Sequence, residues 1–165
     1  LRSAAVARSL LAELGLGRDR VERIAEAIED HGHSRGVSPR SPLGAALQDA
    51  DRLDALGALG IARTFTTGAR LGARHYDPED PWAIARVRDD RRFSIDHFFE
   101  KLLRLPGTMC TPAGRREAAR RARRLHAFLR ALGEEIGQPL PRAAPRAAAA
   151  RASRAWTGRR VRGAD

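Results

Sequence analysis

The chain has 165 residues and a mass of 18.1 kDa, and its 42% hydrophobic and 31% charged residues suit one packed domain and exclude wholesale disorder. No apolar run reaches the roughly 18 residues that a membrane span needs, and none resembles the apolar core of a signal peptide. The single cysteine, Cys110, excludes an internal disulfide framework and a thiolate zinc cluster. We therefore expect a soluble, cytoplasmic protein without a membrane partner.

The first half of the sequence has helical periodicity, interrupted by turn residues. A Ser-Pro pair favours a helix start because Pro fits the first helical turn, where its missing N–H is not needed. In chain order the predicted elements are a helix over 3–15, a helix that a capping box of Asp19 and Glu22 begins, a loop over 31–40, and a helix from Ser41 to about Phe65 with a break near Gly57 or Gly60.

The second half begins with residues 66–92, which have no sustained period and predict a long surface loop, often a functional feature in a compact domain. Ser94 then starts a helix in which Phe93 and Phe98 form a hydrophobic staple, and Pro106 ends that helix. Thr111 starts the last helix, whose apolar stripe continues to Ile136. No useful length of the chain alternates with period 2, so the predicted fold class is all-α.

The net charge of +11 is unevenly distributed. Residues 139–165 hold seven Arg against Asp165, more than half of the excess, in a low-complexity stretch rich in Ala and Pro. This composition predicts a disordered basic tail. Such a tail favours weak, non-specific contact with nucleic acid, whereas the Arg clusters over 115–124 are also what a solvated helix face looks like.

The stretch LQDADRLDALGALGIARTF, residues 47–65, places three aspartates in one predicted helix. Helical spacing puts Asp51 on an otherwise apolar stripe, so its carboxylate is expected to point toward a core, which is costly without compensation. An Arg partner inside the bundle and a metal ion both provide that compensation, and geometry alone leaves the two open. Asp49 and Asp54 are interpreted as ordinary carboxylates of a helix face.

Four segments in order resemble one branch of the HD-domain metal-dependent phosphohydrolases. They are HxxS at 31–34, QDADRLDALGALGIARTF at 48–65, SIDHFFEKLL at 94–103 and TxxGR at 111–115. The resemblance extends over roughly residues 3–137, and the QDADRLDA motif is its most specific part. It implies a helical bundle and a metal held by a His, a His-Asp pair and a later Asp that corresponds to Asp51.

The first His and the His-Asp pair of that pattern have no counterpart in this sequence. We therefore expect residues 1–138 to be a partial HD-type domain whose N-terminal helices, with the other metal ligands, lie upstream, and residues 139–165 to be the basic tail. A catalytically silent relative is the alternative explanation.

For a complete member the resemblance implies a divalent metal, Mn²⁺ or Mg²⁺, which activates a water for attack on a nucleotide-type phosphate or diphosphate ester. Two alternatives stay open. One is a basic helical module that binds nucleic acid non-specifically, and the other is a silent HD relative.

Four further residues match family positions or follow the metal-ligand position. His31 is a candidate catalytic residue, or only a His that favours a helix C-terminus. Arg52 is expected either to orient Asp51 or meet phosphate, or to form a surface salt bridge. His97 and Lys101 stand at i and i+4, so they share a helix face that is either a substrate-binding face or a solvated one.

Overall fold

The computed structural model describes residues 2–31 and 38–142. Its described part confirms the all-α fold: the only extended pairing there is an isolated bridge between Arg74 and Phe93. The helices are α1 (Arg2–Glu13), α2 (Arg18–Asp30), α3 (Pro42–Asp54), α4 (Gly57–Arg70), α5 (Ser94–Glu100), the 3-10 helix η2 (Leu102–Thr108) and α6 (Pro112–Glu135). The serine of the HxxS motif and most of the predicted basic tail lie outside the described residues.

Three predicted helix starts, at Ser41, Ser94 and Thr111, are confirmed and one is wrong. Ser41 and Thr111 cap α3 and α6, and each side chain accepts a hydrogen bond from a glycine N–H three residues later. Asp19 does not cap α2: the helix begins one residue after Gly17, without a side-chain cap, and Asp19 lies in its first turn, where a carboxylate favours the helix dipole.

The break predicted inside residues 41–65 lies at Gly57. Gly57 has φ +74°, a left-handed backbone that an L side chain rarely adopts, and it begins α4 at an angle to α3. The predicted loop 66–92 is wrong at its start, because α4 continues to Arg70 and the irregular segment covers 71–93. Residues 66–70 are mostly polar or small, so the hydrophobic periodicity did not indicate this last turn of α4.

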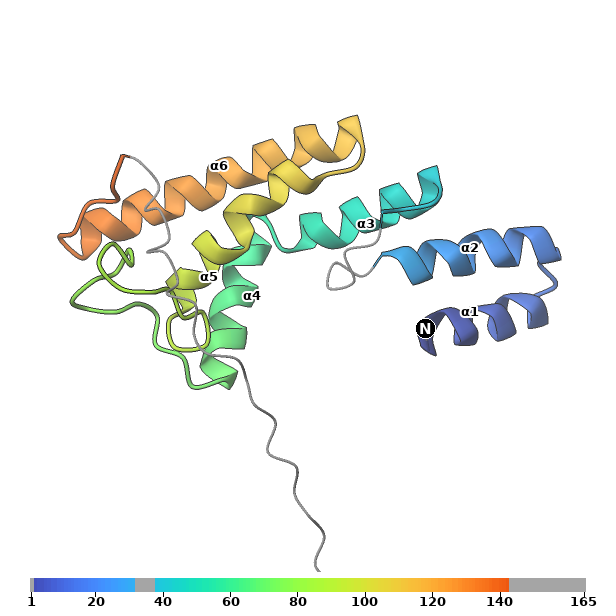
Figure 1. The fold of residues 1–165 in the computed structure, drawn as a ribbon, viewed down its shortest axis with the longest axis horizontal. Helices are drawn as coiled ribbons and strands as arrows, with labels where there is room; N and C mark the ends of the chain where they lie inside the picture. The colour runs from blue at the N-terminus through green and yellow to red at the C-terminus, as the bar shows by residue number, and fades with distance from the viewer. Residues whose placement is uncertain (1, 32–37, 143–165) are drawn as a thin grey trace, which may run out of the picture.

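Long-range packing arranges the helices around α6, which contacts α3, α4 and η2 (Figure 1). Helices α1 and α2 form an antiparallel pair at one end and pack onto α3 through α2. The main core cluster combines the loop, α5, η2 and α6. Its members are Leu56, Trp82, Ile95, Phe98, Phe99, Leu102, Leu105, Met109, Ala118, Leu125 and Leu129.

A buried ion pair anchors the irregular segment 71–93 to the core. Asp96 is fully buried and accepts hydrogen bonds from both terminal nitrogens of Arg86, at 2.6 and 2.8 Å, and from the N–H of Asp89. At the other side of the loop, the Trp82 indole donates to the carbonyl of Gln138. These contacts make the segment a fixed part of the domain that positions the start of α5.

Candidate functional site

The three aspartates of α3 have different environments, and Asp49 is the buried one, with 3% of its surface exposed. Its carboxylate accepts hydrogen bonds from the N–H of Cys110 at 2.7 Å and from the N–H and hydroxyl of Thr111 at 2.8 and 2.7 Å. Burial opposes ionisation, but these donors outweigh it, and the pKa of Asp49 is lowered. The interpretation of Asp49 as an ordinary helix-face carboxylate is therefore wrong, because it joins α3 to the start of α6.

Asp51 is exposed, so the expectation that its carboxylate points into a core is wrong. The helix instead buries Gly44, Gln48 and Asp49, because those positions face α2 and α6. The Asp51 carboxylate forms no hydrogen bond or ion pair with any other described residue. Asp54, also exposed, pairs with Arg63 of α4. Among the α3 aspartates, Asp51 thus has a carboxylate with free coordination capacity.

Arg52 does not contact Asp51, and its role in binding the phosphate of a substrate stays a prediction. Its side chain is 11% exposed, donates to the carbonyl of Thr108 at 2.5 Å, and lies 4.0 Å from a carboxylate oxygen of Asp49. The position after Asp51 turns toward the junction of α3 with α6 because successive helical residues are 100° apart. Arg52 therefore supports this junction.

His31 lies at the C-terminal end of α2, where its Nδ1 is 2.5 Å from the carbonyl oxygen of Ile28. Gln48 of α3 donates a hydrogen bond to the backbone carbonyl of Asp30, the residue before His31, and so joins this end of α2 to α3. His31 therefore lies beside the contact of α2 with α3. Its role as a catalytic residue stays a prediction.

The residues present can be tested against the divalent ion that the family resemblance implies. An exposed carboxylate without another partner is a suitable oxygen ligand for Mg²⁺ or Mn²⁺, and Asp51 meets that condition. Within residues 2–31 and 38–142, however, no three His, Cys, Asp or Glu side chains gather closely enough to hold a metal. Asp51 fits as one ligand, and the described residues do not complete the set.

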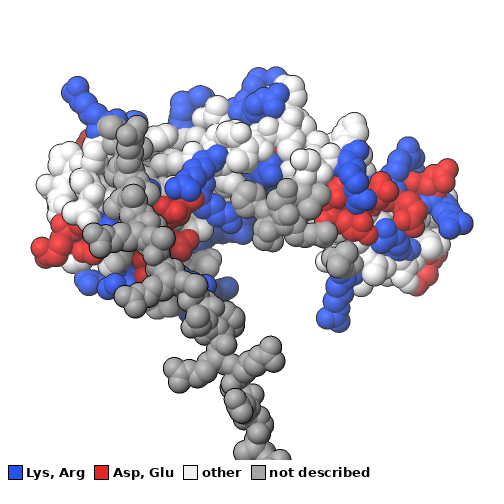
Figure 2. Space-filling view, in the orientation of Figure 1, with Lys and Arg blue, Asp and Glu red and all other residues white. Residues whose placement is uncertain are grey.

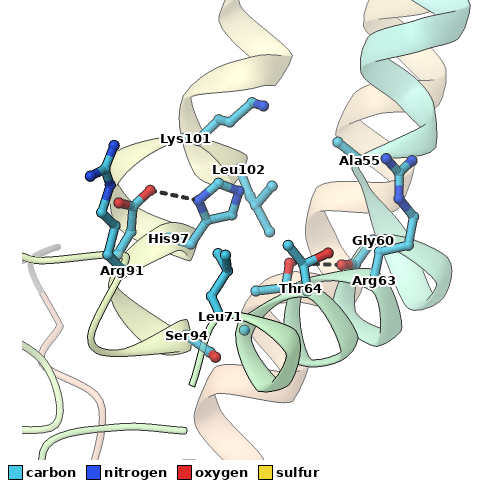
Figure 3. Close-up of a pocket in the computed structure, with 13 residues that line it drawn as sticks. Ala55, Gly60, Arg63, Thr64, Leu71, Arg91, Ser94, His97, Lys101 and Leu102 are labelled. Carbon is cyan, nitrogen blue, oxygen red and sulfur yellow. Dashed lines mark hydrogen bonds and ion pairs between the residues drawn. The ribbon is translucent and has the colours of Figure 1, made fainter. Parts of the chain in front are cut away.

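A groove of about 500 Å³ lies between α4 and α5, next to the end of α3 (Figure 3). Ala55, one turn after Asp51, contributes to its wall. Gly60 allows α4 to approach there, because a Cβ at this position would lie 2.2 Å from the carbonyl oxygen of Ala55. The end of the QDADRLDA motif and the start of α4 thus form one wall of the groove.

The groove brings together His97 and Lys101, the two residues predicted from the DHFxxK segment (Figure 3). His97 is held by Asp90, whose carboxylate oxygen lies 2.9 Å from Nδ1. Arg63 and Arg91 add two more cations to the lining. Sequence reasoning missed Asp90 and Arg91, because both lie in a segment without periodicity. It also missed Arg63, which lies within the quoted motif, two residues before the expected end of its helix.

A second basic surface lies on α6, along the upper edge of the molecule in Figure 2. Arg116, Arg123 and Arg130 recur every seven residues on its exposed face. Glu117 pairs with Arg120 and Arg121, which lower the pKa of Glu117 to about 2. This surface has the form of a solvated helix face, and nucleic-acid contact through the more distant tail stays a prediction.

The chain resembles several bacterial proteins in sequence and structure. It is 35% identical to Bacillus subtilis YpgQ over 125 residues, which are 73% of this chain and 55% of YpgQ. A crystal structure of YpgQ superposes with a TM-score of 0.66 at 32% identity, over 81% of this chain and 63% of the other, and its complex with ADP superposes with a TM-score of 0.64. No protein-family model matches the chain.

An HD-superfamily hydrolase from Bacillus thuringiensis superposes with a TM-score of 0.63 at 36% identity, over 78% of this chain and 60% of the other. The chain belongs to the HD superfamily. It spans little more than half of the length of the curated relative that it matches. None of the described helices is both long and apolar enough to cross a bilayer.

Two of the motifs that resemble the HD superfamily, TxxGR and QDADRLDA, contact each other in the structure. In the TxxGR segment the Thr111 hydroxyl donates to Asp49 and accepts from the N–H of Gly114. A Cβ at Gly114 would lie 2.2 Å from the Asp49 carboxylate, so this position requires glycine. Asp49 of the QDADRLDA motif and the TxxG segment therefore join α3 to α6. These residues have a structural role, and candidates for binding or catalysis must be other residues of the motifs.

Proposed function

We propose that this HD-superfamily chain is part of a metal-dependent phosphohydrolase that acts on nucleotide-type phosphate or diphosphate esters. The observation that carries the proposal is the position of Asp51, exposed and without a partner among the described residues, one turn from a cation-lined groove. The likeness to an HD-superfamily hydrolase and the ADP complex of YpgQ support a nucleotide as the substrate class.

The family resemblance implies that a bound Mn²⁺ or Mg²⁺ supplies an activated water to such a reaction, and Asp51 is proposed as one of its ligands. The groove would hold the phosphate chain through Lys101 and Arg91, which offset its negative charge, while Arg63 in the same lining is paired with Asp54. Leu71 and Leu102 add apolar side chains to the lining of the groove. No described residue contributes a specific contact for a base, so the proposal is restricted to the phosphate end.

The test compares Asp51→Asn with the unsubstituted protein at its full natural length. Phosphate and diphosphate release from nucleoside di- and triphosphates is measured with Mn²⁺, with Mg²⁺ and with a chelator. We expect turnover to require the metal and to fall about a hundredfold or more in Asp51→Asn, because the variant loses a charged ligand while keeping the side-chain size.

Asp19→Asn is the matched control, since Asp19 is an exposed aspartate on α2 far from the groove in the sequence and outside its lining. Circular dichroism should show unchanged helicity in both variants. Turnover of Asp51→Asn at the rate of the control would contradict the assignment of Asp51. Turnover that survives the chelator would contradict metal dependence itself.

A further inference from the structure

The dyad of Asp90 and His97 has a consequence for how the groove binds an anion. A carboxylate can only accept a hydrogen bond, so at 2.9 Å the Nδ1 of His97 must carry the proton of this contact. The second nitrogen, Nε2, lies on the side of the ring that faces the groove (Figure 3). In the neutral ring Nε2 is therefore an acceptor, and it becomes a donor only when the imidazole is protonated.

The charges that face His97 come from three directions and oppose one another. Asp90, in the turn before α5, favours the imidazolium. Arg91 from the same turn and Lys101 at the end of α5 line the same groove and disfavour an additional positive charge, whereas the charge of Arg63 from α4 is offset by Asp54. An anion that enters the groove offsets Arg91 and Lys101, so its arrival favours protonation of His97.

We propose that this groove is a phosphate subsite in which binding is coupled to the uptake of a proton by Nε2 of His97, with Asp90 as the positioning residue. A phosphate oxygen accepts from Nε2–H, while Asp90 keeps Nδ1–H and the ring orientation fixed. The chemical class is the phosphate group, either free or at the end of a nucleotide. This inference rests on the proposed function only for the identity of the substrate, since phosphate binding needs neither metal nor turnover.

The test is titration calorimetry of metal-free protein with inorganic phosphate and, separately, with ADP. Each titration is repeated near pH 8 in buffers of different ionisation enthalpy, so that the number of protons taken up on binding is obtained. At that pH an ordinary imidazole is mostly neutral. His97→Gln is the reference variant, because its amide N–H can still donate to phosphate but takes up no proton.

We expect the unsubstituted protein to take up more protons than His97→Gln, by at most one. If the unsubstituted protein takes up more protons than His97→Gln with inorganic phosphate, the site also binds the free product. If it does so with ADP alone, the site binds esterified phosphate. Both results support the subsite. An equal proton count in the two proteins with both ligands, or no saturable binding of either ligand, overturns it.

Asp90→Asn distinguishes positioning from a merely structural role. The amide oxygen can still accept from Nδ1–H, but the charge that favours the imidazolium is gone, so binding near pH 8 should weaken about three- to tenfold. Near pH 6, where imidazole protonates readily, the loss should largely disappear. A loss that is the same at both pH values contradicts the role of Asp90.

Two further variants separate this inference from the proposed enzyme activity. His126→Gln changes an exposed histidine of α6 outside the groove and should bind phosphate as the unsubstituted protein does. Asp51→Asn should keep the proton-coupled phosphate binding even where it loses turnover. Loss of turnover with intact phosphate binding in Asp51→Asn leaves both proposals standing, whereas normal turnover in that variant removes only the metal assignment.

Discussion

The junction of α3 with α6 and the groove between α4 and α5 both gather charged side chains, but they use them in opposite ways. At the junction, both oxygens of Asp49 are occupied by three donors, and Arg52 donates to a backbone carbonyl. In the groove, the side chains of Lys101 and Arg91 form no hydrogen bond or ion pair with any described residue. Polar groups that are satisfied inside the fold stabilise it, and those that keep free capacity beside a groove are available to a ligand.

The largest change in stability is expected for Asp49→Ala, at the junction of α3 with α6. The substitution removes an acceptor of three hydrogen bonds and leaves two N–H groups without their partner, which we expect to cost about 2–4 kcal/mol of the free energy of unfolding. Urea denaturation followed by circular dichroism measures this cost. Asp51→Ala, at an exposed aspartate of the same helix, should change stability by less than about 0.5 kcal/mol.

Equal destabilisation by the two substitutions would remove the distinction between a carboxylate that joins helices and one that is free. Equal tolerance of both would show that the hydrogen bonds of Asp49 contribute little. The comparison is informative because the residue type, the helix and the replacement are the same, and only the environment differs.

The sequence predicted the secondary structure better than it predicted the burial of α3. Ser41, Thr111 and the stripe from Ala118 to Ile136 followed from local rules of capping and period, and the structure confirms them. Asp49 and Asp51 were assigned the wrong way round. Their burial is decided by α2 and α6, which are distant in sequence, so the periodicity of one helix could not indicate it.

Only the part of the groove that lies on a helix could be predicted from the sequence. His97 and Lys101 share a helix face, and their spacing together with the family motif selected them. Asp90 is in an irregular segment whose path depends on the buried pair of Arg86 with Asp96. That pair joins two residues ten positions apart, and no local pattern indicates that a loop carboxylate will meet His97.

A smaller effect is expected from the pH dependence of the junction. The pKa of Asp49 is lowered in the folded protein: burial opposes this, and the donated hydrogen bonds with the nearby Arg52 outweigh it. A depressed pKa stabilises the fold above the unfolded-state value of about 3.9, and this stabilisation is lost as the pH falls through the folded-state pKa. We therefore expect the stability difference between the unsubstituted protein and Asp49→Asn to shrink below about pH 4.

Urea denaturation of both proteins from about pH 6 to about pH 3 measures that difference. The comparison with Asp49→Asn is needed because Glu29, Asp80 and Glu117 also have lowered pKa values and contribute to acid unfolding in both proteins. A difference that stays constant over the whole range would show that the charge of Asp49 is not what stabilises the junction.

The smallest effect is expected in the groove itself, for Lys101→Ala. Lys101 is exposed and its ammonium group has no described partner, so its loss should leave the free energy of unfolding unchanged within about 0.5 kcal/mol. Binding of inorganic phosphate should weaken about two- to fivefold, the range of an exposed ion pair, and the difference should diminish as salt screens the charge. Arg124→Ala, which removes an exposed cation of α6 outside the groove, should leave phosphate binding unchanged. If both substitutions weaken binding equally, phosphate responds to the net charge of the protein, and the groove has no advantage over the basic face of α6.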